Sequence, residues 1–205
     1  MFADDKDLLR LAPTLFRDAA WLGQRLYRGT VTITGTQLVA PLDVNFFTLG
    51  VRAGGVVVVA GASYEIASVS GNRLNISRPR VSPSDPIIPP TPAIGVEALI
   101  PTFRPQIAAV EPSVLREAGL SATGEQAKIL NASELTEVVA LRAVILVLLI
   151  AGEGRTGTDW ERARIAHFSE LERRATRSVS LLVDTNGDGQ ADEIRALGVL
   201  RLVRI

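Results

Sequence analysis

Apolar positions near the start of the chain follow a helical period. Between Asp7 and Tyr27 they recur at steps of three and four residues, which places them on one face of a helix. Pro13 falls inside this pattern and predicts a kink or a break, because proline lacks a backbone N–H and clashes with the preceding turn. The pattern therefore predicts a helical first segment, residues 1–28, with an interruption at Pro13.

From Thr30 the period shortens to that of β-strands. Short β-branched runs at residues 31–34, 37–39, 56–59, 64–69 and 73–77 are separated by glycine-containing turns. The run 56–59 consists of valine alone, which predicts a strand covered on both faces, whereas 64–69 alternates loosely and predicts one solvated face. Residues 29–80 are expected to form a small barrel or a curled sheet.

Prolines are concentrated after this module. Residues 79–112 contain nine of the 11 prolines of the chain. Because proline fixes φ and removes a hydrogen-bond donor, this density predicts an extended segment over residues 81–112. It is either a passive link between the β module and the helices or an arm that wraps a partner.

Two helices are expected in the last segment, residues 113–205. The first is capped by Asn131 or Ser133 and runs to residue 150, and its residues 138–150 are apolar nearly all round. Such a helix must be surrounded, by its own bundle or by neighbouring subunits, and the small number of other helices favours subunits. The second helix, residues 160–178, has an apolar stripe and arginines mixed with glutamates, typical of a solvated or salt-bridged face. The residues expected to pack between subunits are Val138, Leu141, Ile145, Leu148, Leu149, Trp160 and Phe168.

Composition excludes several classes of protein. The chain has no cysteine, and 22 basic residues balance 22 acidic ones, so disulfides, thiolate metal sites and a charge-driven nucleic-acid binder are not predicted. The first residues lack the layout of a secretory signal. Residues 138–151 contain Arg142 and fall short of the about 20 apolar residues that a membrane-spanning helix needs, so no membrane is expected as a partner.

An acidic turn interrupts two apolar runs near the C-terminus. Asp184, Asn186, Asp188 and Asp192 occupy positions one, three, five and nine of an EF-hand-like loop, which makes them candidate Ca²⁺ ligands. Position twelve, normally a bidentate glutamate, is Arg195. The alternative is a metal-free hairpin turn with a glycine at its tight corner.

Enzymatic motifs are missing. His167 is the sole histidine and has no cysteine or second histidine to complete a ligand set. Residues 152–158 are glycine-rich but follow a helix and lack the Gly-Lys-Ser/Thr ending of a phosphate loop. No enzymatic activity and no resident cofactor are expected, Ca²⁺ at the acidic turn excepted.

The order of elements in the second half resembles that of the head-tail connector (adaptor) proteins of tailed bacteriophages. The resemblance lies in residues 131–134, the apolar helix, Thr158-Asp159-Trp160, the arginine-rich helix, residues 182–189 and an arginine-dotted apolar end. It covers roughly residues 105–205 and the N-terminal helix. It implies an α+β fold in which a helical adaptor core carries an inserted small β-barrel-like module, the proline-rich arm and a C-terminal β-hairpin or strand arm.

The resemblance also implies a function. Members of the family are structural virion proteins that form a homo-oligomeric ring, commonly a dodecamer, between the portal protein and the tail or another neck protein. The ring encloses the channel of the genomic DNA, so the chain is expected in the virion neck after synthesis in the host cytoplasm. The residues expected to dock on the portal or another partner are Gly198, Val199, Leu200, Arg201, Leu202, Val203, Arg204 and Ile205.

Two other hypotheses stay open from the sequence. One is a calcium-dependent binding module in which the loop from Asp184 to Asp192 holds the ion and the β module holds a ligand. The other is a hydrolase without a recognisable motif, which the missing catalytic groups disfavour.

Overall fold

The structure is a computed structural model that describes residues 1–82, 84–121, 125–153 and 159–197. The chain folds into two compact units. One, the barrel unit, comprises residues 4–105. The other, the helical unit, comprises residues 1–3 and 106–205. The fold is therefore mixed α and β, with a closed antiparallel barrel and several helices.

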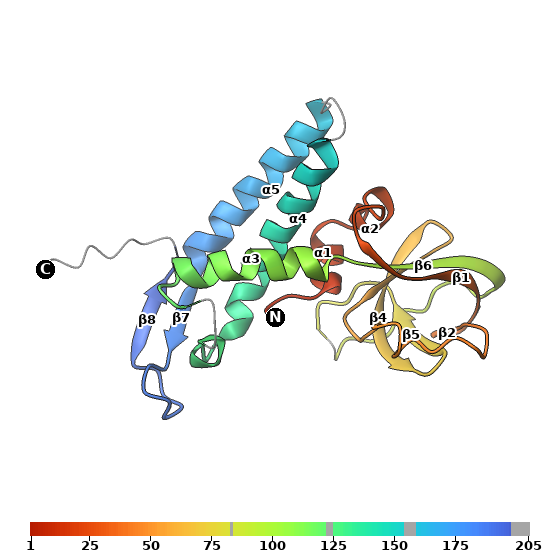
Figure 1. Cartoon of the computed structure of the whole chain (residues 1–205), viewed down its shortest axis with the longest axis horizontal. Coiled ribbons are helices and arrows are strands. Elements are labelled where there is room, and N and C mark those ends of the chain that lie inside the picture. Colours follow the sequence, from red (N-terminus) through yellow and green to blue (C-terminus); the bar gives the residue numbers. More distant parts are fainter. Residues whose placement is uncertain (83, 122–124, 154–158, 198–205) are drawn as a thin grey trace, which may run out of the picture. The chain divides into compact units, whose positions relative to one another are not determined.

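The barrel unit contains six antiparallel strands around a closed barrel (Figure 1). The order around the barrel is β1-β2-β5-β4-β3-β6. Their bounds are β1 Gln24–Thr34, β2 Gln37–Val39, β3 Val56–Val59, β4 Ala62–Ser70, β5 Arg73–Ser77 and β6 Ala93–Thr102. The strands predicted at residues 31–34, 37–39, 56–59, 64–69 and 73–77 are confirmed within β1 to β5, because β-branched runs between glycine turns suit a half-buried pleated surface.

Alternate side chains of the strands fill the barrel. The core includes Val57, Ile66, Leu74, Ala98 and Ile100, each almost fully buried. The connection between β2 and β3 adds Phe46 and Val51 to the same core, while the amide of Phe46 donates to the carbonyl oxygen of Gly71. This connection therefore closes the barrel with apolar side chains and backbone hydrogen bonds.

The predicted N-terminal helix is only partly correct. α1 (Asp5–Leu11) ends before Pro13, as the proline predicts, but α2 (Leu15–Asp18) is one short turn and residues 24–34 form strand β1. β1 pairs with β6 from Gln24 to Ile33, so long-range strand pairing overrides the local helical period around Leu22 and Leu26. The two short helices belong to the barrel unit.

The predicted extended arm over residues 81–112 is wrong in its second half. Residues 93–102 form β6, and α3 (Arg104–Glu117) follows at once. Pro101 lies where the register between β1 and β6 shifts. Pro105 lies in the first turn of α3, where a backbone N–H has no hydrogen-bond acceptor within the helix, so proline is tolerated there. Pro112 lies inside α3.

The first half of the proline-rich segment is a loop fastened at its base. The amide of Arg78 donates to the carbonyl oxygen of Ile88 (3.1 Å), and the amide of Ile88 donates to Ser77 Oγ (3.0 Å). Arg80 pairs through Nε with the buried carboxylate of Glu65, which also accepts the Arg80 amide (3.0 Å). The loop is thus held to the barrel wall by a buried ion pair.

Replacing Arg80 by methionine should destabilise the protein by about 3–5 kcal/mol, because Glu65 is then left charged and unpaired inside the protein. The double variant Arg80→Met/Glu65→Gln, which removes both charges, should recover most of this loss. Urea unfolding of the two variants and the parent measures both effects. Equal losses in the single and double variants would contradict the buried-pair explanation.

The helical unit is built around one apolar helix. α4 (Thr136–Glu153) follows two short 3₁₀ turns, Gln126–Lys128 and Ala132–Leu135, and lies beside α5 (Asp159–Ser178) (Figure 1). Val138, Leu141, Val144 and Val147 of α4 are fully buried. The predicted helices at 131–150 and 160–178 are confirmed to within a few residues.

A β-hairpin completes the helical unit. β7 (Ser180–Val183) pairs with β8 (Glu193–Ala196) across the acidic turn. Asn131, expected as a helix cap, makes no cap bond. Its side-chain amide instead accepts from the Leu182 amide and donates to the Ser180 carbonyl oxygen (both 2.8 Å), as a neighbouring strand would.

Candidate functional site

The α4 helix changes from buried to exposed along its length. Leu149 and Ile150 are 47% and 36% exposed, and Trp160 at the start of α5 is 64% exposed. The guanidinium of Arg164 lies over the Trp160 ring, 5.1 Å from the ring centre. Most of the indole surface nevertheless stays exposed to solvent. We call Leu149, Ile150 and Trp160 the apolar tip of the helix pair.

The residues expected to pack between subunits therefore divide into two groups. Val138, Leu141 and Phe168 are buried within their own unit, so the expectation is corrected for these three: the chain itself surrounds this half of the helix. Leu149 and Trp160 are exposed, and Ile145 and Leu148 are half-buried. The second group remains available to a partner.

Arg142 lies in the middle of α4, between Leu141 and Ala143, which are both fully buried. Its guanidinium forms a bidentate pair with Glu117 of α3 (2.7 Å each) and donates through Nε to Glu172 of α5 (2.8 Å). Burial disfavours its charge, but the hydrogen bonds with Glu117 and Glu172 outweigh this and raise the pKa of Arg142. One side chain thus joins three helices. We call this cluster the Arg142 clamp.

Length and composition alone also admit a membrane helix. The helical stretch Ala132–Gly152, 21 residues, is long and apolar enough to cross a bilayer, contrary to the estimate from residues 138–151. One such helix is weak evidence, because the core helix of a folded unit meets the same criteria. Here 44% of the tested window is buried inside the protein.

The acidic turn is organised by its own backbone. Asp184, 6% exposed, accepts the amides of Gly187 (2.6 Å) and Gly189 (2.8 Å). Asp192 accepts the hydroxyl (2.7 Å) and amide (2.8 Å) of Thr185, and this hydroxyl hydrogen bond contributes most to lowering its pKa. Both glycines have φ of +84°, which other residues rarely adopt. The turn therefore closes through hydrogen bonds from the chain itself.

Metal binding at this turn stays a prediction. Asn186 donates through its side chain to Asp192 (3.2 Å) and Asp188 (3.4 Å), so the four candidate ligands lie on one turn. In the described part of the chain, however, no group of three or more His, Cys, Asp or Glu side chains is arranged to hold a metal ion.

Arg195 lies at the position where an EF-hand loop has its bidentate glutamate. In this structure its side chain connects the hairpin to the end of α3. Its Nη1 donates to the carbonyl oxygens of Gly119 (2.8 Å) and Ala118 (3.2 Å), just after α3, while its Nε pairs with Glu193 (2.8 Å). Gly119 has φ of +69°, as a residue that ends a helix commonly does. A cation beside the carbonyl end of a helix is stabilising, so Arg195 ties the hairpin to α3.

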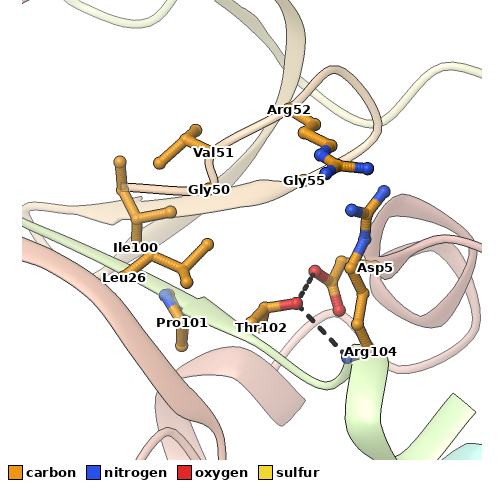
Figure 2. Close-up of a pocket in the computed structure, with 10 residues that line it drawn as sticks. All are labelled: Asp5, Leu26, Gly50, Val51, Arg52, Gly55, Ile100, Pro101, Thr102 and Arg104. Carbon is orange, nitrogen blue, oxygen red and sulfur yellow. Dashed lines mark hydrogen bonds between the residues drawn. The ribbon is translucent and has the colours of Figure 1, made fainter. Parts of the chain in front are cut away.

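A buried carboxylate closes the barrel unit, and sequence reasoning missed it. Asp5 of α1 accepts the Thr102 hydroxyl (2.5 Å) and the Phe103 amide (2.8 Å). Asp5 and Thr102 line a cavity of about 10 Å³. Figure 2 shows them together with Arg52 and Arg104, which line the same cavity. Burial raises the pKa of Asp5 to about 6, against the hydrogen bonds and the Arg104 charge, which lower it. The cavity holds at most one water molecule.

His167, the histidine considered as a catalytic candidate, is exposed on α5. Its ring lies edge-on to the ring of Phe168, with 5.5 Å between the ring centres. Residues 198–205, expected to dock on the portal or another partner, lie outside the described residues.

Comparison with known proteins adds no relative: no family model, curated protein or solved structure matches the chain.

The Asp5 carboxyl predicts a pH dependence of stability. Its folded pKa of about 6 exceeds the ordinary 3.8, so the folded state binds the proton more tightly. The protonated Asp5 carboxyl therefore stabilises the folded state below pH 4, and this contribution is lost as the pH rises through 6. Asp5→Asn, which is neutral at every pH, should match the parent near pH 4 and exceed it by about 2–3 kcal/mol at pH 8.

Chemical unfolding at several pH values measures this difference. Asp43→Asn, at an exposed carboxyl, is the control and should shift stability little at any pH. A difference between Asp5→Asn and the parent that does not change with pH would contradict the assignment.

The Arg142 clamp predicts a second difference in stability, between the parent protein and a variant that lacks the Arg142 guanidinium. Arg142→Met should lower the free energy of unfolding by about 1–3 kcal/mol, because two carboxylates lose a partly buried partner. Arg173→Met is the matched control: Arg173 also pairs with a glutamate, Glu170, but both side chains are exposed, so the loss should be below about 1 kcal/mol. Similar losses at both positions, measured by urea unfolding, would show that the clamp contributes no more than a surface pair.

Proposed function

We propose that the chain is a structural protein of the neck of a tailed bacteriophage. It forms a homo-oligomeric ring between the portal protein and the tail or another neck protein, completes the connector and encloses the DNA channel. The observation that carries the proposal is the apolar tip formed by Leu149, Ile150 and Trp160, because an exposed apolar surface on an otherwise well-packed unit marks an interaction site.

The order of elements supports the same proposal. α4, α5 and the β7–β8 hairpin follow one another as the connector resemblance implies. The barrel unit occupies residues 4–105 and includes the N-terminal helices, which the resemblance assigns to the adaptor core, so the support comes from the order of elements in the helical unit. We therefore assign the helical unit to the ring and the barrel unit to an added contact with a neighbouring particle component.

The role is one of assembly rather than catalysis. α4 buries one face within its own unit, so the protomer folds first and then associates through the apolar tip and through residues 198–205. The resemblance names the portal as one neighbour. Contact with DNA in the channel is non-specific, consistent with 22 basic and 22 acidic residues. The calcium-dependent module remains an untested alternative, and none of the geometry of the described residues favours it.

The purified chain should have a native mass that is a multiple of the protomer mass. Leu149→Glu should weaken association about tenfold or more, since burying one leucine contributes about 1.5–3 kcal/mol and the variant adds a charge. Its far-UV circular dichroism should stay unchanged because Leu149 is 47% exposed.

Ile94→Glu is the matched control, at an exposed isoleucine of the barrel unit. It should leave the native mass unchanged. A parent chain that stays monomeric at every concentration, with or without a portal protein, would overturn the ring proposal.

A further inference from the structure

The proline-rich loop before β6 contains a stretch whose conformation is fixed by its own sequence. Residues 86–92 read Pro-Ile-Ile-Pro-Pro-Thr-Pro, and they belong to neither a helix nor a strand. Proline fixes its own φ at about −65° and pushes the residue before it into extended conformations. Ile87 alone among the seven is neither a proline nor directly before one. The sequence therefore favours polyproline II, a left-handed helix with about three residues per turn.

Exposure along this stretch follows the same period of three, because positions three apart form one ridge of a polyproline II helix. The first ridge is exposed throughout and consists of Pro86, Pro89 and Pro92. The second ridge is also exposed and consists of Ile88 and Thr91. In the third ridge Ile87 is 39% exposed and Pro90 is buried. The third ridge therefore faces the protein, and the other two face solvent.

The stretch is attached to the barrel wall at its middle. The amide of Ile88 donates to Ser77 Oγ, and the carbonyl oxygen of Ile88 accepts the amide of Arg78, as described above. Ser77 is the last residue of β5, so the stretch is fastened where that strand ends. Because its conformation and position are set before a partner binds, binding costs little conformational entropy.

The exposed surface offers hydrogen-bond acceptors and carries no charge. Proline has no backbone N–H, so most of the backbone polar groups of the stretch are carbonyl oxygens. Of the carbonyl oxygens of residues 86–91, that of Ile88 alone accepts a hydrogen bond within the described part of the chain. Residues 86–96 contain no charged side chain. A matching partner surface must therefore supply apolar contact and hydrogen-bond donors rather than charge.

Aromatic side chains with a polar group meet both requirements. The flat rings of Trp and Tyr fit between the ridges of a polyproline II helix, and their N–H or O–H groups can donate to its free carbonyl oxygens. A lipid surface meets only the first requirement, because the carbonyl oxygens would be buried there without donors. The chemistry of the stretch therefore favours a protein groove lined by aromatic side chains.

The exposed aromatic side chains of this chain do not form such a groove. In its described part they are Trp21, Phe47 and Trp160. Trp21 and Phe47 contact no other aromatic ring of the described residues, and Phe47 has no side-chain donor. Trp160 is already stacked with Arg164. The groove therefore belongs to a different protein.

We propose that residues 86–92 are a preformed polyproline II ligand for an aromatic-lined groove on a different protein of the phage particle. This inference rests on the proposed function, and it gives the chemistry of the neighbouring component that the barrel unit contacts. Each ridge repeats once per turn, about 9 Å along the helix. The rings that line the groove should be spaced by about the same distance.

Photo-crosslinking in the assembled particle tests the proposal. A diazirine-bearing aliphatic amino acid replaces Thr91, which is exposed on the second ridge. The particles are irradiated, and the linked peptides are identified by mass spectrometry. The expected result is a link to a different protein at a site that contains Trp or Tyr. Replacing those aromatic residues of the partner by alanine should abolish the link.

Pro89→Ala in the labelled chain is the test variant, and Pro41→Ala is the matched control. Alanine at position 89 frees φ and removes a ring from the first ridge, so the yield of the link should fall about fivefold or more. Pro41 is also an exposed proline of the barrel unit but lies outside the stretch, so its replacement should leave the yield unchanged. Both variants should keep the far-UV circular dichroism of the parent.

The outcomes separate this inference from the proposed function. Four results would overturn the ligand and leave the neck assignment standing: a link to another copy of this chain, a linked site without Trp or Tyr, equal yields from the two variants, or no link in particles that contain the chain. A chain that is absent from the particle would overturn both.

Discussion

The ion pairs of Arg142 hold α4 against its two neighbouring helices. The guanidinium binds Glu117 of α3 and Glu172 of α5, so the most apolar helix of the unit has fixed neighbours. One face of α4 is buried from Val138 past Arg142 to Val147. The helix becomes exposed only near its C-terminal end, at Leu149 and Ile150. A helix that is apolar nearly all round therefore keeps one face for folding and leaves an apolar end uncovered.

Much of the fold could be predicted from local patterns. Helices α4 and α5, strands β2 to β5 and the last four residues of β1 follow from their periods and from β-branched runs between glycine turns. The sequence does not predict β6 although Val96, Ala98 and Ile100 alternate along its inner face, because the nearby prolines favour an extended segment without strand pairing. The local helical period extends beyond the true end of the N-terminal helices, because the pairing of β1 with β6 joins residues distant in sequence.

The site could be predicted less well, for a physical reason. The apolar helix and the acidic turn are visible in sequence, but exposure is decided by what packs on each residue. Phe168 and Trp160 have the same apolar character, yet one is 6% and the other 64% exposed. The sequence shows Arg195 only at the position where an EF-hand loop has its glutamate ligand, because its hydrogen bonds to the carbonyl oxygens after α3 depend on the tertiary fold. Asp5 gave no signal at all, because its partners lie in β6 and just after it.

The bonds from Asp5 to Thr102 and Phe103 hold together the two places where the backbone enters and leaves the barrel unit. A domain whose ends are neighbours can be excised and bridged by a short peptide, or exchanged for another, without stretching the polypeptide around it.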